Sequence, residues 1–172
     1  MDYTCHYDSP LGGITLGGCG EALIGLWFDD QDHFGETLGP ESAEAPLPVF
    51  DGARRWLDVY FEGRDPGFTP KLALRGTLFQ RSVWEALLSI PYGRTETYAS
   101  IARKVGLSPA SARAVGGAVG RNPVSLIVPC HRVLGASGRL TGYAGGLERK
   151  RWLLERENYD FAEQNHNFRV ES

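Results

Sequence analysis

The residues best suited to chemistry lie in one short stretch, Pro129-Cys130-His131-Arg132-Val133. A thiol, an imidazole and a guanidinium in consecutive positions are costly to bury unless each finds a partner. Free cysteine is among the most buried residue types, so Cys130 taken alone would be interpreted as a core residue. The adjoining His131 and Arg132 favour a nucleophile instead, because a cationic neighbourhood lowers the pKa of a thiol.

The elements on either side of Cys130 determine what can reach it. The apolar run Ser125-Leu126-Ile127-Val128 follows the turn residues Arg121-Asn122-Pro123, and this order indicates a buried strand. Further along, apolar spacing predicts a helix over residues 147–157. Glu157 shares the apolar side of that helix. It is therefore either a solvated edge residue or the partner of a buried histidine.

Two helices joined by a tight turn are predicted in the segment that begins at Thr97. Thr97 is the expected N-cap of a helix that runs through Val105 and stops at Gly106. Ser108 is the expected N-cap of the next helix, with Pro109 at its first position. This arrangement is typical of a helix-turn-helix.

The second of these helices is nearly bare of long side chains. Its small residues are Ala110, Ser111, Ala112, Ala114, Gly116, Gly117 and Ala118. A glycine inside a helix costs about 1 kcal/mol relative to alanine, so two adjacent glycines need a reason. One reason is close packing within the protein. The other is a backbone that lies against the minor groove of DNA, with Arg113 filling a gap in the base stack.

The first half of the chain predicts a β-meander and one helix. The predicted strands cover residues 3–7, 14–16 and 22–28, and the helix covers 49–61. The acidic, proline-containing segment 29–48 and the segment 135–142 are expected to be loops, and a further helix is expected over 79–89. We therefore expect an α+β protein. Its predicted parts are an N-terminal domain over 1–75, a mostly helical domain over 76–158 and an extension over 159–172.

Composition limits the class of protein. Of 172 residues, 42% are hydrophobic and 23% are charged, as in ordinary globular proteins. No apolar run approaches the ~20 residues that span a bilayer, and the N-terminus lacks a signal-peptide pattern. The three cysteines, Cys5, Cys19 and Cys130, are odd in number and widely spaced, which indicates free thiols in a reducing compartment. We expect a cytoplasmic protein, or a nuclear one in a eukaryote.

The net charge of −3 conceals an asymmetry between the two halves. Residues 1–75 carry five Lys/Arg against 13 Asp/Glu, residues 76–157 carry 12 against five, and the remainder carries one against three, so −8, +7 and −2 sum to −3. A basic half suggests a surface that faces a polyanion. A solvated basic face, or attraction between the halves, would give the same count.

The stretch around Cys130, with Asn122-Pro123 upstream, closely resembles the O6-alkylguanine-DNA alkyltransferases (methylated-DNA–protein-cysteine methyltransferases), in their bacterial pattern. Other matching motifs are Arg113-Ala114-Val115-Gly116-Gly117, Tyr143-Ala144-Gly145-Gly146-Leu147 and Trp152-Leu153-Leu154 before Glu157. The likeness is close over residues 79–157. It is weaker at the front, over Asp8-Ser9-Pro10-Leu11-Gly12 and Tyr60-Phe61-Glu62-Gly63. It implies a ribonuclease H-like N-terminal domain and a helix-turn-helix.

The resemblance implies direct repair of DNA. Members of the family flip O6-alkylguanine out through the minor groove and move its alkyl group to their own cysteine, which here is Cys130; O4-alkylthymine is an implied second substrate. The thioether product has no good leaving group, so the protein acts once and is consumed. The implied partner is double-stranded DNA, with single-stranded DNA as another. The protein is expected to be a monomer, and no cofactor, metal or membrane is expected.

The resemblance also implies roles for individual residues. His131 would be the base, acting through a water, Glu157 would orient it, and Asn122 would hold the turn before Cys130. The residues expected to contact DNA are Arg113, which would replace the flipped base, Tyr98, Ser108, Ala112, Ala114 and Gly116. Tyr143 would hydrogen-bond the leaving guanine. The residues expected to border the pocket with it are Val133, Ser125, Ala144 and Gly145.

Some positions depart from the family pattern. Ser125 and Ala144 stand where vertebrate-type members have Pro and Ser, which would alter the tolerance of bulky adducts. Family zinc ligands are incomplete, because Cys19 matches one but Ile24 replaces a histidine. Two other functions compete with DNA repair. A non-catalytic lesion-binding protein of the alkyltransferase-like kind is disfavoured by the presence of Cys130, and a helix-turn-helix regulator by a helix with few side chains to read bases.

Overall fold

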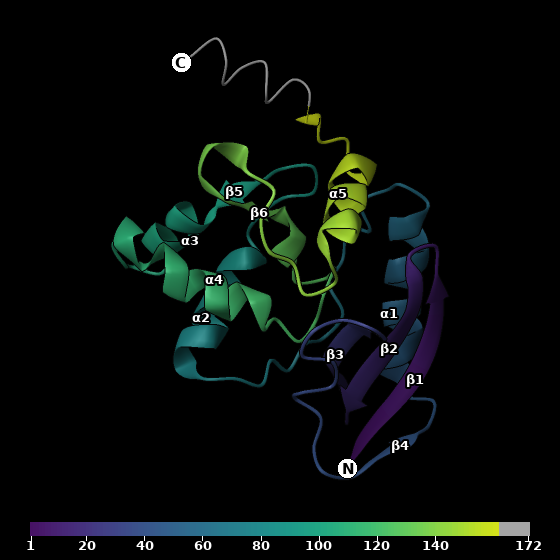
Figure 1. Cartoon of the computed structure of the whole chain (residues 1–172). Helices are drawn as coiled ribbons and strands as arrows, with labels where there is room; N and C mark the ends of the chain where they lie inside the picture. Colours follow the sequence, from purple (N-terminus) through teal and green to yellow (C-terminus); the bar gives the residue numbers. More distant parts are fainter. Residues whose placement is uncertain (162–172) are drawn as a thin grey trace.

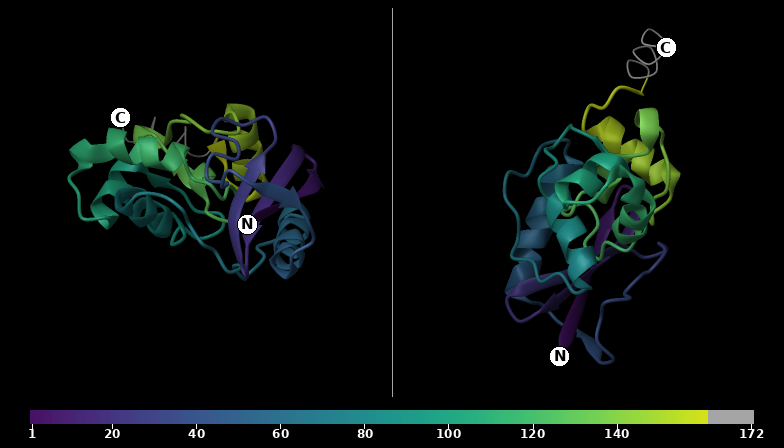
Figure 2. Two further views of the ribbon diagram at one scale, coloured as in Figure 1. Left: turned by 90° about the horizontal axis from the view of Figure 1, so that it is seen from below. Right: turned by 90° about the vertical axis from the view of Figure 1, so that its left-hand side faces the viewer.

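The computed structural model describes residues 1–161 and arranges them as a sheet with one helix followed by a group of short helices. Figures 1 and 2 show the sheet and α1 on one side of the molecule and α2, α3 and α4 on the other. The predicted α+β class is confirmed. Most of the predicted extension over 159–172 lies outside the described residues.

The N-terminal sheet has the strand order β3-β2-β1-β4. The strands are β1 (Asp2–Ser9), β2 (Gly12–Cys19), β3 (Ala22–Phe28) and β4 (Ser42–Glu44). The first three form the predicted antiparallel meander. β4 pairs in parallel with β1, so the expectation of loop alone over 29–48 was wrong there. Its three exposed residues pair through backbone groups and carry no apolar alternation that would reveal a strand.

Helix α1 (Pro48–Phe61) confirms the predicted helix in the first half. Proline suits the first turn of a helix because its missing N–H would have no partner there. The apolar residues recur at helical spacing and form one buried face: Phe50, Ala53, Trp56, Leu57, Tyr60 and Phe61. This face places Tyr60 in the interior of the molecule, where its exposed fraction is 0%.

The second half contains α2 (Leu78–Leu87), α3 (Tyr98–Lys104), α4 (Ala112–Gly120) and α5 (Leu147–Arg156). The hydroxyl of Thr97 accepts a hydrogen bond from Ser100 N, which confirms the predicted cap of α3. Ser108 also caps as predicted, but it caps a 3₁₀ turn, Pro109–Ser111, that leads into α4. A short parallel pair, β5 (Glu96–Thr97) and β6 (Val133–Leu134), and a 3₁₀ turn, Ala136–Gly138, complete this half.

The prediction of a buried strand before Cys130 was wrong. The segment meets the sheet in one isolated bridge, Leu26 to Val124, and then leaves it. Leu126 has φ 72°, a left-handed conformation that ends any strand. Cys130–Arg132 form a 3₁₀ turn, so these residues do not continue an extended chain. A short apolar run indicates burial reliably but does not distinguish a strand from a buried loop.

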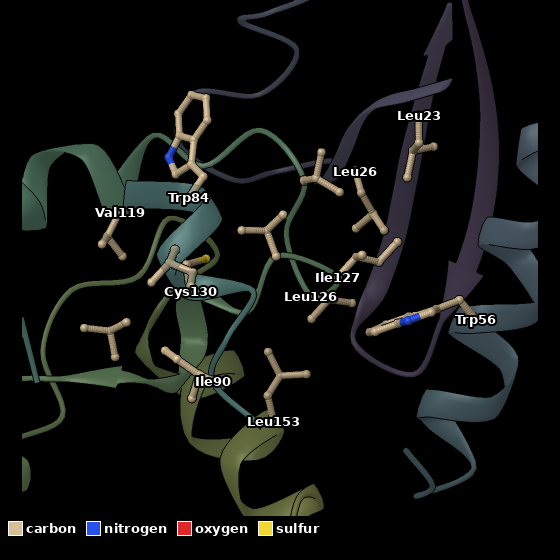
Figure 3. Close-up of a cluster of buried hydrophobic side chains, with 14 of the residues drawn as sticks. Leu23, Leu26, Trp56, Trp84, Ile90, Val119, Leu126, Ile127, Cys130 and Leu153 are labelled. Carbon is tan, nitrogen blue, oxygen red and sulfur yellow. The ribbon is translucent and has the colours of Figure 1, made fainter. Parts of the chain in front are cut away.

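One hydrophobic cluster joins both halves of the described chain. Figure 3 shows Cys130 among buried side chains that include Trp84, Val119 and Ile90, with Leu26 and Trp56 of the first half in the same cluster. Backbone bonds cross the same junction, from Leu26 N to Pro123 O at 2.9 Å and from Ser125 N to Leu26 O at 3.0 Å. The sheet edge therefore supports the segment that leads to the cysteine. No helix within residues 1–161 is long and apolar enough to cross a bilayer.

Candidate active site

A cavity of about 300 Å³ opens onto Cys130. It is lined by Asp32, His33, Tyr98, Gly116, Val119, Gly120, Cys130, Gly142, Tyr143 and Ala144. Four of the predicted site residues, Tyr98, Gly116, Tyr143 and Ala144, therefore lie together with the thiol. Val133, Ser125 and Gly145 were expected to border the pocket but are not among the residues that line this cavity.

The cysteine is held by the turn that precedes it. Asn122 Nδ2 donates to Val128 O at 2.8 Å, and Asn122 Oδ1 accepts from Val124 N at 3.0 Å. One buried side chain thus satisfies two backbone groups that have no strand partner. These bonds place Cys130 at the end of a fixed loop, with only 5% of its surface exposed.

The electrostatic surroundings of the thiol differ from those expected. Burial raises the pKa of Cys130, while Asn122 and Lys150 oppose that shift. Arg132, the cation adjoining in sequence, turns away and donates from Nη1 to Ile90 O at 2.8 Å. The thiol is therefore protonated at rest, and it needs a base before it can act as a nucleophile.

His131, next to Cys130 in the chain, forms a buried, hydrogen-bonded pair with Glu157. His131 Nε2 lies 2.6 Å from Glu157 Oε2, and both side chains are buried. Burial lowers the pKa of His131 and favours the neutral imidazole. Burial alone would raise the pKa of Glu157, but His131 and Arg132 hold that pKa well below its usual range. Because a carboxylate only accepts hydrogen bonds, the shared proton is on Nε2 and the buried Nδ1 stays free as an acceptor.

Glu157 is bound by more groups than the sequence indicated. Arg132 Nε donates to Oε1 at 2.7 Å and Gly93 N donates to the same oxygen at 3.1 Å. Tyr60 Oη, from α1, donates to Oε2 at 2.6 Å. The family-like motif around Tyr60 was visible in the sequence, but nothing there indicated a contact with a residue 97 positions away.

A fully buried lysine secures the loop that forms one wall of the cavity. Lys150 Nζ donates to Thr141 O at 2.5 Å and to Gly142 O at 3.0 Å, just before Tyr143. Burial lowers the pKa of Lys150 to about 8. Lys150 precedes Glu157 by seven residues, a spacing that puts both on one face of α5. This spacing was the signal that sequence reasoning missed.

Helix α4 presents its bare surface outward. Arg113, Ala114 and Gly117 are exposed, and Ala112 and Gly116 are partly exposed. A methyl group added at Gly117 would meet nothing within 4 Å, and one at Gly116 would make only ordinary contact with the Tyr98 ring. Packing within the protein therefore does not require these glycines. Ser108 is exposed at the turn before this helix.

A loop of the N-terminal half completes the cavity. Asp32 N donates to Ala144 O at 3.0 Å, and Ser125 Oγ donates to Gln31 Oε1 at 3.3 Å. Arg121, for which the sequence offered no role, pairs with Glu36 of this loop at 2.5 Å. The acidic half thus contributes to the wall of the site, which its composition did not reveal.

Comparison with known proteins agrees with this geometry. Residues 78–159 match the family described as 6-O-methylguanine DNA methyltransferase, DNA binding domain, and residues 3–74 match the ribonuclease-like domain of the same family. The methylated-DNA–protein-cysteine methyltransferase of Mycobacterium tuberculosis strain H37Rv is 51% identical over 157 residues, covering 88% of this chain and 92% of that protein. The chain belongs to this methyltransferase family.

Other members of the methyltransferase family are similarly close. The namesake from Methanosarcina acetivorans is 47% identical, covering 90% of this chain and 97% of that protein. The crystal structure of the Mycobacterium tuberculosis OGT in complex with DNA superposes with a TM-score of 0.80 at 49% identity, covering 91% of each chain. The fold likeness therefore extends over both halves.

Proposed function

We propose that this chain repairs DNA by transferring the alkyl group of O6-alkylguanine to Cys130, once per molecule. It is a methylated-DNA–protein-cysteine methyltransferase by its family. The observation that carries the assignment to Cys130 is a buried thiol at the end of a fixed turn. It opens onto a cavity of about 300 Å³ and lies next to the His131–Glu157 pair. O4-alkylthymine is a second substrate of the same chemistry.

The proposed step moves one proton and one alkyl group. His131 Nδ1 accepts the proton of the Cys130 thiol through a bridging water, and Glu157 stabilises the resulting imidazolium. The thiolate attacks the alkyl carbon, an S–C bond forms and the C–O6 bond breaks. The electron pair stays on the guanine, which takes up, through water, the proton that His131 accepted, and Tyr143 hydrogen-bonds the base as it leaves. A thioether remains on the protein, and because it has no good leaving group the protein is spent.

The reason for a water between Cys130 and His131 differs from the one that a strand would give. In a strand, neighbouring residues point in opposite directions, and that alone would call for a water between Cys130 and His131. Cys130 and His131 instead occupy a 3₁₀ turn. The free, buried Nδ1 is now the reason for a water in the relay, since it has no protein partner.

The proposed DNA-binding surface is α4 with the turn before it. An exposed helix whose glycines are not needed for internal packing suits close approach to a sugar-phosphate backbone in the minor groove. Arg113 would fill the gap left by the flipped base, and Tyr98, at the cavity, would help rotate the nucleotide. Ser108 at the turn, with Ala112, Ala114 and Gly116 on the helix, would contact the strand. The helix-turn-helix assignment belongs to this proposal.

The same proposal assigns different roles to the two domains. Residues 76–158 would bind DNA and carry the transfer, and residues 1–75 would support the site. The protein would act as a monomer on double-stranded DNA, with activity on single strands, and without a cofactor. It would work in the cytoplasm, or in the nucleus of a eukaryote, where its substrate lies.

The test is to incubate the full chain with duplex DNA that contains O6-methylguanine and to locate the methyl group by peptide mass spectrometry. We expect one methyl group per chain, on Cys130. Cys130→Ala should take up none and should still bind the DNA. Lesion binding by the wild type without methylation of Cys130 would support a non-catalytic lesion-binding protein and would contradict the proposal.

A further inference from the structure

The hydroxyl of Tyr60 is the contact of the N-terminal half with the proposed catalytic groups. Its Oη lies 2.6 Å from Glu157 Oε2 and 3.5 Å from His131 Nε2. The Tyr60 hydroxyl and the His131 Nε2–H thus share a single carboxylate oxygen. A buried tyrosine hydroxyl usually has an acceptor, and a backbone carbonyl would serve as well as this carboxylate. The choice of acceptor is what calls for a reason.

The ring of Tyr60 is fixed by its neighbours. It stacks on Trp56 with centroids 5.1 Å apart and an angle of 8° between the planes. It also meets Phe61, Tyr92 and His131 edge to face. Its exposed fraction is 0%. The hydroxyl is therefore held in one position on a rigid helix and does not have to be ordered when substrate arrives.

Two donors on one oxygen weaken each other. A hydrogen bond from Tyr60 withdraws negative charge from Glu157 Oε2, which makes that oxygen a weaker acceptor for His131. Burial, followed by the charge of Glu157, raises the pKa of Tyr60 well above its usual value. The hydroxyl thus keeps its proton and stays a donor wherever the protein is folded.

We propose that Tyr60 is a positioning residue that tempers the pull of Glu157 on His131 and so keeps the imidazole neutral and able to accept the Cys130 proton. This inference rests on the proposed function. The charged and titratable groups beside His131 are Glu157, Arg132, Lys150, the Tyr60 hydroxyl and the adjoining Cys130. Of these, Glu157 alone is an anion at neutral pH, so its strength as an acceptor governs how readily His131 takes a proton.

The direct test is Tyr60→Phe in the full chain, which removes one oxygen atom and leaves the ring. Glu157 should then stabilise the imidazolium more strongly, so His131 should titrate about half a unit to one unit higher. A base works only in its unprotonated form, so the acid limb of the transfer rate should move up by the same amount. Below that limb the rate should fall by about three- to tenfold, and at high pH it should recover.

The matched control is Tyr92→Phe. Tyr92 lies edge to face with Tyr60 at 6.2 Å, and its buried hydroxyl has no hydrogen-bond partner. Removing it takes the same atom from the same cluster without touching Glu157. The acid limb of this variant should coincide with that of the wild type. The proposal fails if the acid limb shifts equally in the two variants. It also fails if Tyr60→Phe lowers the transfer rate by the same factor at every pH, because Tyr60 would then only pack.

Two further measurements keep the test decisive. The ring carbons of ¹³C-labelled histidine report the titration of His131 without any transfer, with His131→Gln assigning the signal. A raised pKa of His131 in a protein that takes no methyl group would preserve this inference and contradict the proposed function.

If Tyr60→Phe does not fold, 3-fluorotyrosine at position 60 is the second variant, because it keeps the shape of the side chain and its hydroxyl donates more strongly. The limb should then move to lower pH, and a limb that stays in place would overturn the proposal.

Discussion

Replacing Glu157 by glutamine tests the centre of the site with an almost isosteric change. Arg132 would remain buried, at 7% exposure, without the anion that its Nε meets at 2.7 Å. Removing one partner of a buried ion pair costs about 3–5 kcal/mol of stability. His131 would also lose the acceptor that fixes the proton on Nε2. In serine proteases an orienting carboxylate changed to an amide gives the wrong tautomer and costs on the order of 10⁴ in rate, so we expect at least a hundredfold loss of transfer here.

The assay for Glu157→Gln combines urea unfolding with single-turnover transfer from O6-methylguanine duplex. Glu155→Gln is the control, since its carboxylate is 51% exposed on the same helix and pairs with Arg151. That pair should contribute less than about 1 kcal/mol. A Glu157→Gln protein with wild-type stability and wild-type rate would refute the reasoning.

The pH dependence of stability checks the same residue. The folded-state pKa of Glu157 lies below its ordinary value of 4.5. The stability that it contributes is therefore present above about pH 4.5 and is lost as the pH falls below it. Glu157→Gln should not show this loss of stability in acid. The unfolding free energies of the wild type and of Glu157→Gln, plotted against pH, should therefore converge at low pH. Parallel curves would show that Glu157 is not stabilised as an anion.

Three further predictions concern other parts of the site. Asn122→Ala should lower the free energy of unfolding by about 1–3 kcal/mol, because it leaves the buried Val124 N–H unpaired and removes one of the two hydrogen bonds to Val128 O, and urea titration measures this. Arg113→Ala should slow repair in duplex DNA on the order of tenfold and change repair in single strands less; equal effects would contradict an intercalating arginine. Lys150, with a pKa of about 8 against 10.5 in the unfolded chain, opposes folding while it is charged. Wild-type stability should therefore rise relative to Lys150→Met by about 3 kcal/mol between pH 8 and 10.5, and a constant difference would contradict a buried charged lysine.

Local patterns predicted the elements that local physics controls. The helices α1 and α5 followed from apolar spacing, and Thr97 and Ser108 followed from capping chemistry. The segment before Cys130 was misassigned because side-chain bonds from Asn122 replace a strand ladder, and an apolar run cannot reveal such bonds. Propensity and periodicity report neighbours in the chain.

The residues of the candidate site could be predicted where they lie in a recognisable sequence motif. Cys130 and Glu157 were singled out by their neighbours in the sequence, the resemblance gave roles to them and to His131, and these roles remain predictions. The contributions of Tyr60 and Gln31 depend on how the sheet and α1 dock against the second half. Such contacts join residues far apart in the chain and leave no periodic trace. Lys150 was the exception, since its spacing from Glu157 was readable.

The order of the network along the chain has a consequence for synthesis on the ribosome. Within residues 1–161, the protein groups that bind the Glu157 carboxylate lie earlier in the chain, from Tyr60 through Gly93 to His131 and Arg132. N-terminal parts emerge and fold first, so the cysteine leaves the ribosome before the carboxylate that completes its relay. Until α5 docks, His131 has no orienting anion. In the proposed mechanism, alkyl transfer to this single-use thiol would therefore begin only after the last helix has docked.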